Sequence, residues 1–405
     1  MIEILTIGHE LLDGRVVNSN ESLISSFLLE KGLRVNRSLT IPDDLSLIKQ
    51  CITESLTRAS VLIVTGGLGP TEDDITRQAI AGAAGVDLIL DQDALNDIKS
   101  FFSKKDKAMP ESNIKQAYLP NGATLLSNHQ GTAPSFSTII RNTLLIALPG
   151  PPNELMPILK TNALPQMMRF LGIIEASSIQ ETLRTFGIGE SLLQDKLTPV
   201  YPLPEGVELS FQASPAEVLI HLLSKKENQL AFDSLRTKIV SIVGKDIYHT
   251  GKETYIDLLV QKLITEKKTI GFAESCTGGL VSKLLSDISG VSDCFKGSVV
   301  SYSNDVKISQ LGVNKDTISS NGAVSEQCAL EMAIGVRRTL KTSMGASITG
   351  IAGPNGGTNE KPVGTVYIAI SSEKKNWVKP FQFYGNRERI RFLAAKHCLY
   401  NCLKF

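Results

Sequence analysis

Residues 61–76 have the sequence VLIVTGGLGPTEDDIT, in which a short apolar run leads directly into a glycine-rich turn. The β-branched run at 61–64 is typical of a buried parallel strand, and a helix is expected from about Asp74 to Ala84, with Gly85 at its end. The surrounding sequence continues this alternation, with strands expected at 2–6, 33–39 and 144–148 and helices at 20–31, 46–59 and, interrupted by prolines, 153–170. Strands that alternate with helices of this length predict a parallel α/β sheet.

The chain has 405 residues, which is too many for one ordinary core and predicts two or three domains. A composition of 42% hydrophobic and 20% charged residues excludes wholesale disorder. Because 42 basic side chains are balanced by 41 acidic ones, neither nucleic acid nor a membrane is expected as a partner. Apolar runs are too short to span a bilayer, and residues 1–14 lack the basic start of a signal peptide. Six scattered cysteines with no CxxC pair predict reduced thiols and a cytoplasmic protein.

The pattern changes near residue 178, which predicts three domains, at 1–172, 173–250 and 251–405. The middle segment is expected to be a small α+β unit, with strands at 182–186, 207–213 and 217–223 and helices at 192–197 and 227–243. The last segment again alternates, with strands at 270–273, 298–301, 346–349 and 365–370 and helices from about 253 and at 278–288, 325–340 and 387–402. We therefore expect α/β domains at both ends of the chain.

The first glycine-rich turn is a candidate phosphate site. Its glycines, Gly66, Gly67 and Gly69, would let a ligand approach the backbone, and Thr71 or Asp73 could cap the helix that follows. Adjacent carboxylates at Asp73 and Asp74 would repel a phosphate unless a divalent cation of the Mg²⁺ type lay between them. The alternative is an ordinary tight turn with a capping box and solvated carboxylates.

A second candidate site lies in residues 272–280, FAESCTGGL, where a buried strand again passes into a helix. Ser275 would be a nucleophile at that junction, with backbone N–H groups beside it to form an oxyanion hole. As the base, Lys307 is a better candidate than His397 or His249. It is expected in a strand-to-loop passage and could act as a base if burial lowers its pKa. Tyr302 could relay the proton or position the leaving group. The alternative makes Ser275 a helix cap and Lys307 a solvated charge.

Two further features could contribute to this second site. The glycine-dense loop at 350–357, which includes Gly350 and Gly353, could line a substrate phosphate or amide, or it could be a plain loop. Arg387, at the start of the last helix, could contact a phosphate, although arginines on helix faces are usually only solvated.

Taken together, these motifs resemble the CinA family over essentially the whole chain. The carrying motifs are the segments 8–14, 66–76, 131–134, 149–154, 274–279, 302–307 and 349–354. The first domain resembles the MoaB/MogA-like, molybdopterin-binding type, the middle one a KH-type domain, and the last one the nicotinamide-nucleotide amidases. The resemblance implies a multidomain α/β protein with this order of domains.

The resemblance also implies two activities in the recycling of pyridine nucleotides. The C-terminal domain would deamidate nicotinamide mononucleotide without a metal or cofactor, with Ser275 as nucleophile, Lys307 as base and Tyr302 assisting. Thr277, Gly278 and Gly279 would hold the oxyanion or the phosphate. The N-terminal domain would be a metal-dependent ADP-ribose pyrophosphatase with its metal on Asp73 and Asp74. Family members of this kind are expected to be homodimers.

Other interpretations remain open from the sequence. The N-terminal domain could bind a nucleotide or a pterin without hydrolysing it, and the chain could be a competence-associated regulatory or binding protein. Nucleic-acid binding by the middle domain is disfavoured by the charge balance and by the lack of a GxxG loop with basic flanks. His9 and Ser135 depart from the family pattern, and Ser135 is expected to stiffen a turn near the substrate.

Overall fold

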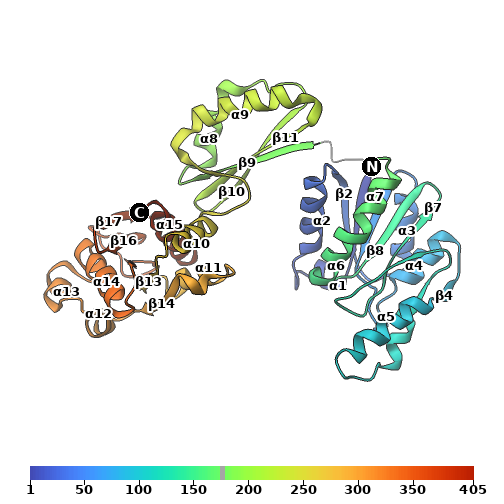
Figure 1. The fold of residues 1–405 in the computed structure, drawn as a ribbon, viewed down its shortest axis with the longest axis horizontal. Coiled ribbons are helices and arrows are strands. Elements are labelled where there is room, and N and C mark those ends of the chain that lie inside the picture. Colours follow the sequence, from blue (N-terminus) through green and yellow to red (C-terminus); the bar gives the residue numbers. More distant parts are fainter. Residues whose placement is uncertain (174–177) are drawn as a thin grey trace. The chain divides into compact units, whose positions relative to one another are not determined.

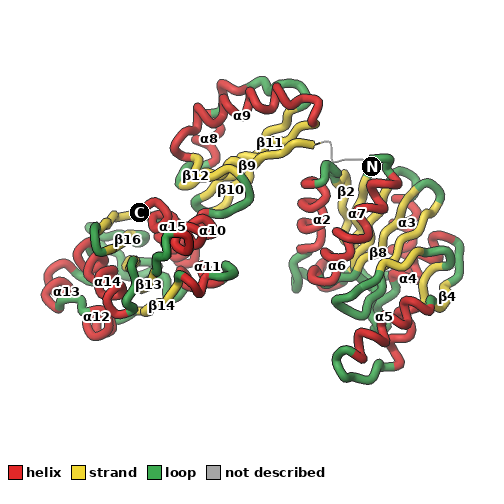
Figure 2. Tube along the Cα trace, viewed as in Figure 1, coloured by secondary structure: helices red, strands yellow, loops and turns green. Residues whose placement is uncertain are grey.

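The computed structural model describes residues 1–173 and 178–405, which form two compact units, Met1–Ser178 and Ile179–Phe405 (Figure 1). Both units contain helices and strands, as the tube in Figure 2 shows. Among the described residues, no helix is both long and apolar enough to cross a lipid bilayer.

The first unit is built on a six-stranded sheet with the order β2-β1-β3-β8-β7-β6. Four strands are mutually parallel: β1 (Ile2–Ile7), β2 (Val35–Ile41), β3 (Val61–Thr65) and β8 (Thr143–Leu148). The strands β7 (Ser135–Ile140) and β6 (Thr124–Leu126) extend this sheet in antiparallel fashion. The predicted parallel α/β sheet is confirmed, and β2 begins two residues later than expected.

Helices cover both faces of this sheet. The helices α2 (Ser19–Glu30), α6 (Pro152–Ile158) and α7 (Leu164–Phe170) contribute to one apolar core, and α3 (Leu45–Ser55), α4 (Thr76–Ala84) and α5 (Gln92–Ser103) to the other. A short helix, α1 (His9–Leu12), follows β1, and a two-stranded sheet joins β4 (Leu88–Leu90) to β5 (Tyr118–Pro120). The helix predicted at 153–170 is divided by a π-helical turn at Leu159–Ala163, just after Pro157 removes one backbone donor.

The second unit begins with a four-stranded sheet of order β10-β11-β9-β12, packed against two helices. Its elements are β9 (Ser178–Phe186), α8 (Glu190–Lys196), β10 (Val207–Ser214), β11 (Glu217–Lys225), α9 (Gln229–Val243) and β12 (Ile247–Thr250). This arrangement confirms the predicted α+β character, and it adds the strand β12, which pairs with β9.

The C-terminal part of the unit contains a five-stranded sheet of order β14-β13-β15-β16-β17. Its strands are β13 (Ile270–Glu274), β14 (Phe295–Val300), β15 (Met344–Gly350), β16 (Thr365–Ser372) and β17 (Asn376–Gln382). On one face lie α10 (Tyr255–Thr265), α11 (Leu280–Ser286) and α15 (Arg387–Lys404), and on the other α12 (Asn304–Leu311), α13 (Lys315–Asn321) and α14 (Glu326–Thr339). The first three strands are parallel, so their carboxyl ends meet at one edge of the sheet.

Two local predictions are wrong, and one alternative is excluded. Neither Thr71 nor Asp73 caps α4, which begins at Thr76 with no side-chain cap, because the side chains of Thr71 and Asp73 bond within the turn instead. Ser275 is not a helix cap, since α11 begins only at Leu280. Lys307 lies on a helix, α12, whose N-cap is Ser303, and not in a strand-to-loop passage.

Candidate active site

Ser275 follows directly after β13, at the carboxyl edge of the C-terminal sheet. Its N–H donates to Ile348 of the neighbouring β15 at 3.0 Å, so the serine backbone is fixed by the sheet. The turn to α11 then passes through Gly278 and Gly279, whose φ angles are 60° and 96°. Side chains other than glycine are strained in this left-handed region, so these two glycines let the chain reverse immediately after the serine.

The carboxylate of Glu274 occupies the N-terminus of α11 and is fully buried. It accepts from the N–H groups of Gly279 at 2.9 Å, Val281 at 3.1 Å and Ser282 at 3.0 Å, and also from the Ser282 hydroxyl. The Gly278 N–H in turn donates to the carbonyl of Ser275. The N–H groups of both predicted glycines therefore already have acceptors within the protein.

Two other N–H groups remain beside the serine. Those of Cys276 and Thr277 donate to no backbone carbonyl or carboxylate among the residues described. The Thr277 hydroxyl is also fully buried and has no hydrogen-bond partner there. Buried donors without acceptors are uncommon in folded proteins, so Thr277 carries unused hydrogen-bonding capacity next to Ser275.

Lys307 reaches this serine from the opposite side. Its Nζ lies 3.0 Å from Ser275 Oγ, 2.7 Å from the carbonyl oxygen of Ser301 and 3.4 Å from that of Tyr302. The lysine is only 2% exposed. The helix α12 positions it, because its first turn follows closely after the end of β14 and directs the side chain back toward β13.

Burial lowers the pKa of Lys307, because the protonated amine loses its hydration. The same burial raises the pKa of Cys276 to about 12 and that of Cys328 to about 11, so both thiols stay protonated. Lys307 is consequently a buried amine with a lowered pKa, in hydrogen-bonding contact with a serine hydroxyl. That is the arrangement a general base requires.

Tyr302 contacts the lysine through its backbone, whereas its side chain points elsewhere. The phenol is largely exposed, and its hydroxyl accepts from Arg387 Nη2 at 2.9 Å. Arg387 also donates to the carbonyl of Gly353 at 2.8 Å. Arg387 thus ties the end of β14 to the glycine loop after β15, which is a structural role that the sequence did not predict.

The glycine loop is shaped by its own packing. A Cβ on Gly350 would lie 2.6 Å from Val366, and one on Gly353 would lie 2.6 Å from Val363. Both glycines are therefore required by the approach of the next strand, whether or not a ligand lies beside them.

Arg391 is a site residue that sequence reasoning missed. Its Nε donates to the carbonyl of Cys276 at 3.0 Å and its Nη2 to that of Thr277 at 2.7 Å. It therefore holds the serine loop from α15, one helical turn beyond Arg387. The four-residue spacing to Arg387 was a visible signal, since residues at i and i+4 share one face of a helix.

The predicted phosphate turn of the first unit borders a separate cavity of about 610 Å³. Gly66, Gly67, Gly69 and Thr71 line it, as do Asp73, Asp74 and Glu10. A Cβ on Gly66 would meet the carbonyl of Ile7 at 2.2 Å, so the turn is pressed against β1. Arg77, which the sequence did not single out, is buried and donates to the carbonyls of Leu68 and Gly69, and its burial lowers its pKa to about 10.

The carboxylates of this turn differ in how many of their lone pairs are used. Asp74 accepts from the N–H groups of Gly69 and Thr71 at 2.7 and 2.8 Å, and it lies 2.6 Å from the Thr71 hydroxyl, whose single proton it shares with Asp73. Asp73 is exposed, and the Thr71 hydroxyl donates to it and lowers its pKa. Among the described residues no three His, Cys, Asp or Glu side chains are grouped closely enough to hold a metal. The pair therefore fits a divalent cation only where a ligand phosphate completes the coordination, which is common for Mg²⁺.

The surroundings of the two residues that depart from the family pattern, His9 and Ser135, differ. His9 pairs with Asp43 at 3.1 Å. Ser135 begins β7 and is fully buried. The expectation that Ser135 stiffens a turn is therefore wrong, because the residue lies within the sheet.

Three family models match the chain, each over a separate segment. The models are described as "Probable molybdopterin binding domain" for residues 3–169, "Damage-inducible protein CinA KH domain" for 180–248 and "CinA C-terminal domain" for 252–405. Two CinA-like proteins are each 38% identical to it, one from Kosmotoga olearia and one from Dictyoglomus thermophilum, and each alignment covers 98% of this chain and 97% of the relative. The chain belongs to the CinA family.

A solved structure of CinA from Thermoplasma acidophilum, a protein described as having unknown function, is 34% identical. It covers 41% of this chain and 98% of its own, with a TM-score of 0.38. In this CinA-family chain, Ser275, Thr277, Lys307 and Arg391 all fall within the segment that the C-terminal family model matches.

Proposed function

We propose that the C-terminal domain is a serine–lysine amidohydrolase that converts nicotinamide mononucleotide and water into nicotinate mononucleotide and ammonia. The observation that carries this proposal is the 3.0 Å contact between Lys307 Nζ and Ser275 Oγ, made by a lysine that is almost fully buried. Burial lowers the pKa of Lys307, so its neutral, proton-accepting form becomes available at lower pH than in an exposed lysine.

The chemistry follows from this contact in two halves. In the first, neutral Lys307 takes the proton of Ser275 as Oγ attacks the carboxamide carbon, and the resulting ammonium returns that proton to the amide nitrogen. The C–N bond then breaks, ammonia leaves and an ester to Ser275 remains. In the second half, Lys307 takes a proton from water, whose oxygen attacks the ester carbon. The bond between this carbon and Ser275 Oγ then breaks, Lys307 returns its proton to the serine, and the new carboxylic acid releases its remaining proton to solvent as nicotinate.

Thr277 is the best-placed group for the oxyanion that forms in each half. Its N–H and hydroxyl have no acceptor among the described residues, and both belong to the loop that follows the nucleophile. Donors that are fixed before the reaction stabilise a developing negative charge without reorganisation. In this proposal Gly278 and Gly279 act by their backbone shape, since their N–H groups are already used.

The choice of nicotinamide mononucleotide comes from the resemblance to nicotinamide-nucleotide amidases. Tyr302, Arg387 and the loop of Gly350 and Gly353 are proposed to bind the nucleotide beside the reacting carboxamide. Their mutual hydrogen bonds support a shared surface at the carboxyl edge of the sheet. Tyr302 would assist by position, because its phenol is bonded to Arg387.

For the first unit we propose a metal-dependent ADP-ribose pyrophosphatase. The cavity beside the turn, the exposed carboxylate of Asp73 and the remaining lone pair of Asp74 support it. When bound, a divalent cation would supply charge neutralisation of a diphosphate; the chain itself would supply the glycine turn that Arg77 holds in place. The alternative, a domain that binds a nucleotide or pterin without hydrolysis, rests on the same cavity.

The deciding experiment is ammonia release from nicotinamide mononucleotide by the purified chain, with and without EDTA, and with nicotinate mononucleotide measured by chromatography. We expect equal amounts of both products and no effect of EDTA. Absence of ammonia at high enzyme concentration would refute the amidase.

For the first unit, calorimetry with ADP-ribose and Mg²⁺, combined with detection of AMP, separates hydrolysis from binding alone. The homodimer and the cytoplasmic location also remain predictions.

A further inference from the structure

The helix α15 contacts both the candidate active site and the middle domain. Near its start, Arg387 and Arg391 donate to the loops around Ser275. Five residues after Arg391, Lys396 donates to the middle domain. At 1.5 Å per residue these two contacts are separated by about 7.5 Å along one continuous helix.

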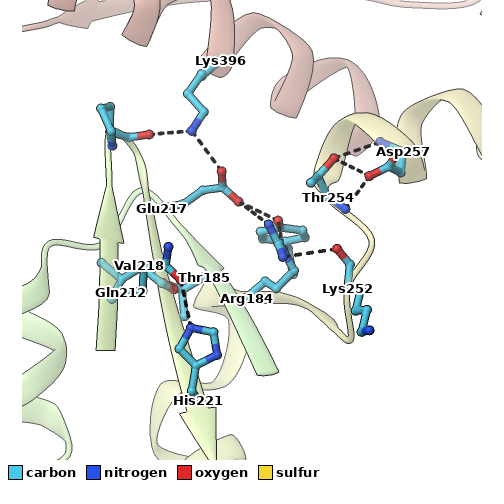
Figure 3. A network of polar contacts seen from close by, with 12 residues as sticks. Arg184, Thr185, Gln212, Glu217, Val218, His221, Lys252, Thr254, Asp257 and Lys396 are labelled. Carbon is cyan, nitrogen blue, oxygen red and sulfur yellow. Dashed lines mark hydrogen bonds and ion pairs between the residues drawn. The ribbon is translucent and has the colours of Figure 1, made fainter. Parts of the chain in front are cut away.

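The middle-domain partner of Lys396 is the turn between β10 and β11 (Figure 3). Lys396 Nζ lies 2.8 Å from the carbonyl oxygen of Pro215 and 3.0 Å from Glu217 Oε2. Lys396 is 8% exposed and Glu217 7% exposed, so the pair is shielded from water. Shielding makes the interaction directional and strong, and it also makes an unpaired charge costly.

Glu217 is shared by a second cation. Tyr248 donates its hydroxyl to Glu217 Oε1 at 2.7 Å, and Arg184 Nη2 lies 3.6 Å from the same oxygen. Arg184 also donates to the Tyr248 hydroxyl at 2.8 Å. One carboxylate therefore faces two cations, Lys396 from α15 and Arg184 from β9, as the dashed lines of Figure 3 show.

Aromatic packing closes the same joint. Phe186, at the end of β9, stacks on Tyr400 of α15 with ring centroids 3.8 Å apart. The rings of Tyr255 and His397 make edge contacts with Phe186, with centroids 5.2 and 4.9 Å away. Phe186 belongs to the apolar core of the C-terminal domain, so the two domains share an interior at this point.

We propose that Lys396 is a positioning residue for the serine loop, and that the middle domain is thereby a working part of the amidase. The turn at Pro215 and Glu217 fixes α15 through Lys396, and α15 fixes the carbonyls of Cys276 and Thr277 through Arg391. This inference rests on the proposed amidase function for its kinetic consequence. Displacement of catalytic groups by about 1 Å can cost on the order of a hundredfold in rate, so a loosened α15 lowers kcat.

The buried charges around Glu217 decide which substitution can test the positioning role of Lys396. Removing Glu217 would leave two buried cations without a carboxylate and could prevent folding. Lys396→Met removes one cation and leaves Arg184 and Glu217 as a balanced pair, while the aliphatic stem keeps most of its packing. This variant therefore separates loss of positioning from loss of the fold.

Lys262→Met is the matched control. Lys262 Nζ, on α10, donates to the carbonyl of Leu403 at 2.8 Å, so it holds the far end of the same helix but makes no described contact with the middle domain. Both variants replace one lysine that bonds a backbone carbonyl. They differ in that the carbonyl bonded by Lys396 belongs to the middle domain and that Lys396 also pairs with Glu217 of that domain.

In the full chain we expect Lys396→Met to lower kcat about tenfold with KM changed less than twofold, and to speed amide hydrogen exchange in residues 275–279. Lys262→Met should leave kcat and this exchange within twofold of wild type. If kcat and exchange in Lys396→Met match those of the control, the positioning role is refuted. If the wild-type chain releases no ammonia, the amidase proposal fails, and the exchange measurement alone then decides whether Lys396 orders the loop.

Discussion

Lys307 Nζ lies 3.0 Å from Ser275 Oγ, although 32 residues separate the two in the sequence. The serine follows directly after β13, and the lysine lies in the first turn of α12, after the parallel neighbour β14. The parallel pairing brings the end of β14 beside Ser275, so a lysine on the following helix can reach the serine. This pair underlies the predictions for the C-terminal domain.

Ser275→Ala and Lys307→Met should each abolish ammonia release from nicotinamide mononucleotide, because the first removes the nucleophile and the second the base. Losses of about a thousandfold or more are expected for residues that act as one unit. Neither variant should lower the melting temperature by more than a few degrees, and Lys307→Met no longer buries an ionisable amine. Near wild-type turnover in either variant would show that the assignment is wrong.

The amidase rate should rise with pH through the pKa of Lys307. Burial lowers that pKa from 10.5, so the neutral, proton-accepting amine forms at lower pH than for an exposed lysine. Values of kcat/KM measured between pH 7 and 10 test this. The phosphate of the substrate, a monoester with a second pKa of about 6, is already ionised over this range and does not contribute to the profile. The expected curve climbs and levels off below pH 10.5. A rate that falls across this range would contradict a lysine base.

Arg391→Met should lower kcat about ten- to hundredfold with little change in KM, because the carbonyls of Cys276 and Thr277 lose the donor that fixes the serine loop. Arg391→Lys should recover part of this loss, since one ammonium can reach one of the two carbonyls. Steady-state kinetics on both variants provide the measurement. Equal activity of Arg391→Met and wild type would mean that the loop holds its shape without this arginine.

Glu274→Ala should reduce the free energy of unfolding of the C-terminal domain by about 2–4 kcal/mol. Three N–H groups and the Ser282 hydroxyl would lose a buried acceptor at the start of α11. Urea unfolding followed by the fluorescence of Trp377, the single tryptophan of the chain, reports on this domain. Glu266→Ala is the control, because its ion pair with Lys268 is exposed to solvent and contributes little to stability. Equal effects of both substitutions would argue against a capping role.

Asp73→Asn should weaken Mg²⁺-dependent turnover or binding of ADP-ribose at the first site and leave the amidase unchanged. Asp73 is the cleaner variant, because Asp74 also holds the turn through the N–H groups of Gly69 and Thr71. Calorimetry at fixed ADP-ribose with increasing Mg²⁺ measures the effect, for which a loss of about tenfold is expected for one metal-bound carboxylate. Unaltered Mg²⁺ dependence would remove Asp73 from the metal site.

The sequence pattern was sufficient for the central parallel strands of the first sheet, because short apolar runs such as 61–64 and 144–148, each followed closely by glycine or proline, favour buried parallel strands. It failed at β17, an exposed edge strand that contains Pro380, and at α12 and α13, where short polar helices carry no strong apolar repeat. The start of α4 was also predicted two residues too early, at Asp74. The carboxylate of Asp74 accepts hydrogen bonds from N–H groups of the turn, and α4 begins only at Thr76.

The sequence by itself determined the strand–turn–helix junctions and the residue types within them, because these depend on local backbone preferences and apolar pattern. Only the tertiary structure decided that Lys307 meets Ser275 and that Arg391 and Lys396 link the serine loop to the middle domain. Burial and the pairing of segments far apart in the chain set the pKa of a lysine and the acceptor of an arginine. Neither property can be read from the neighbours of a residue along the chain.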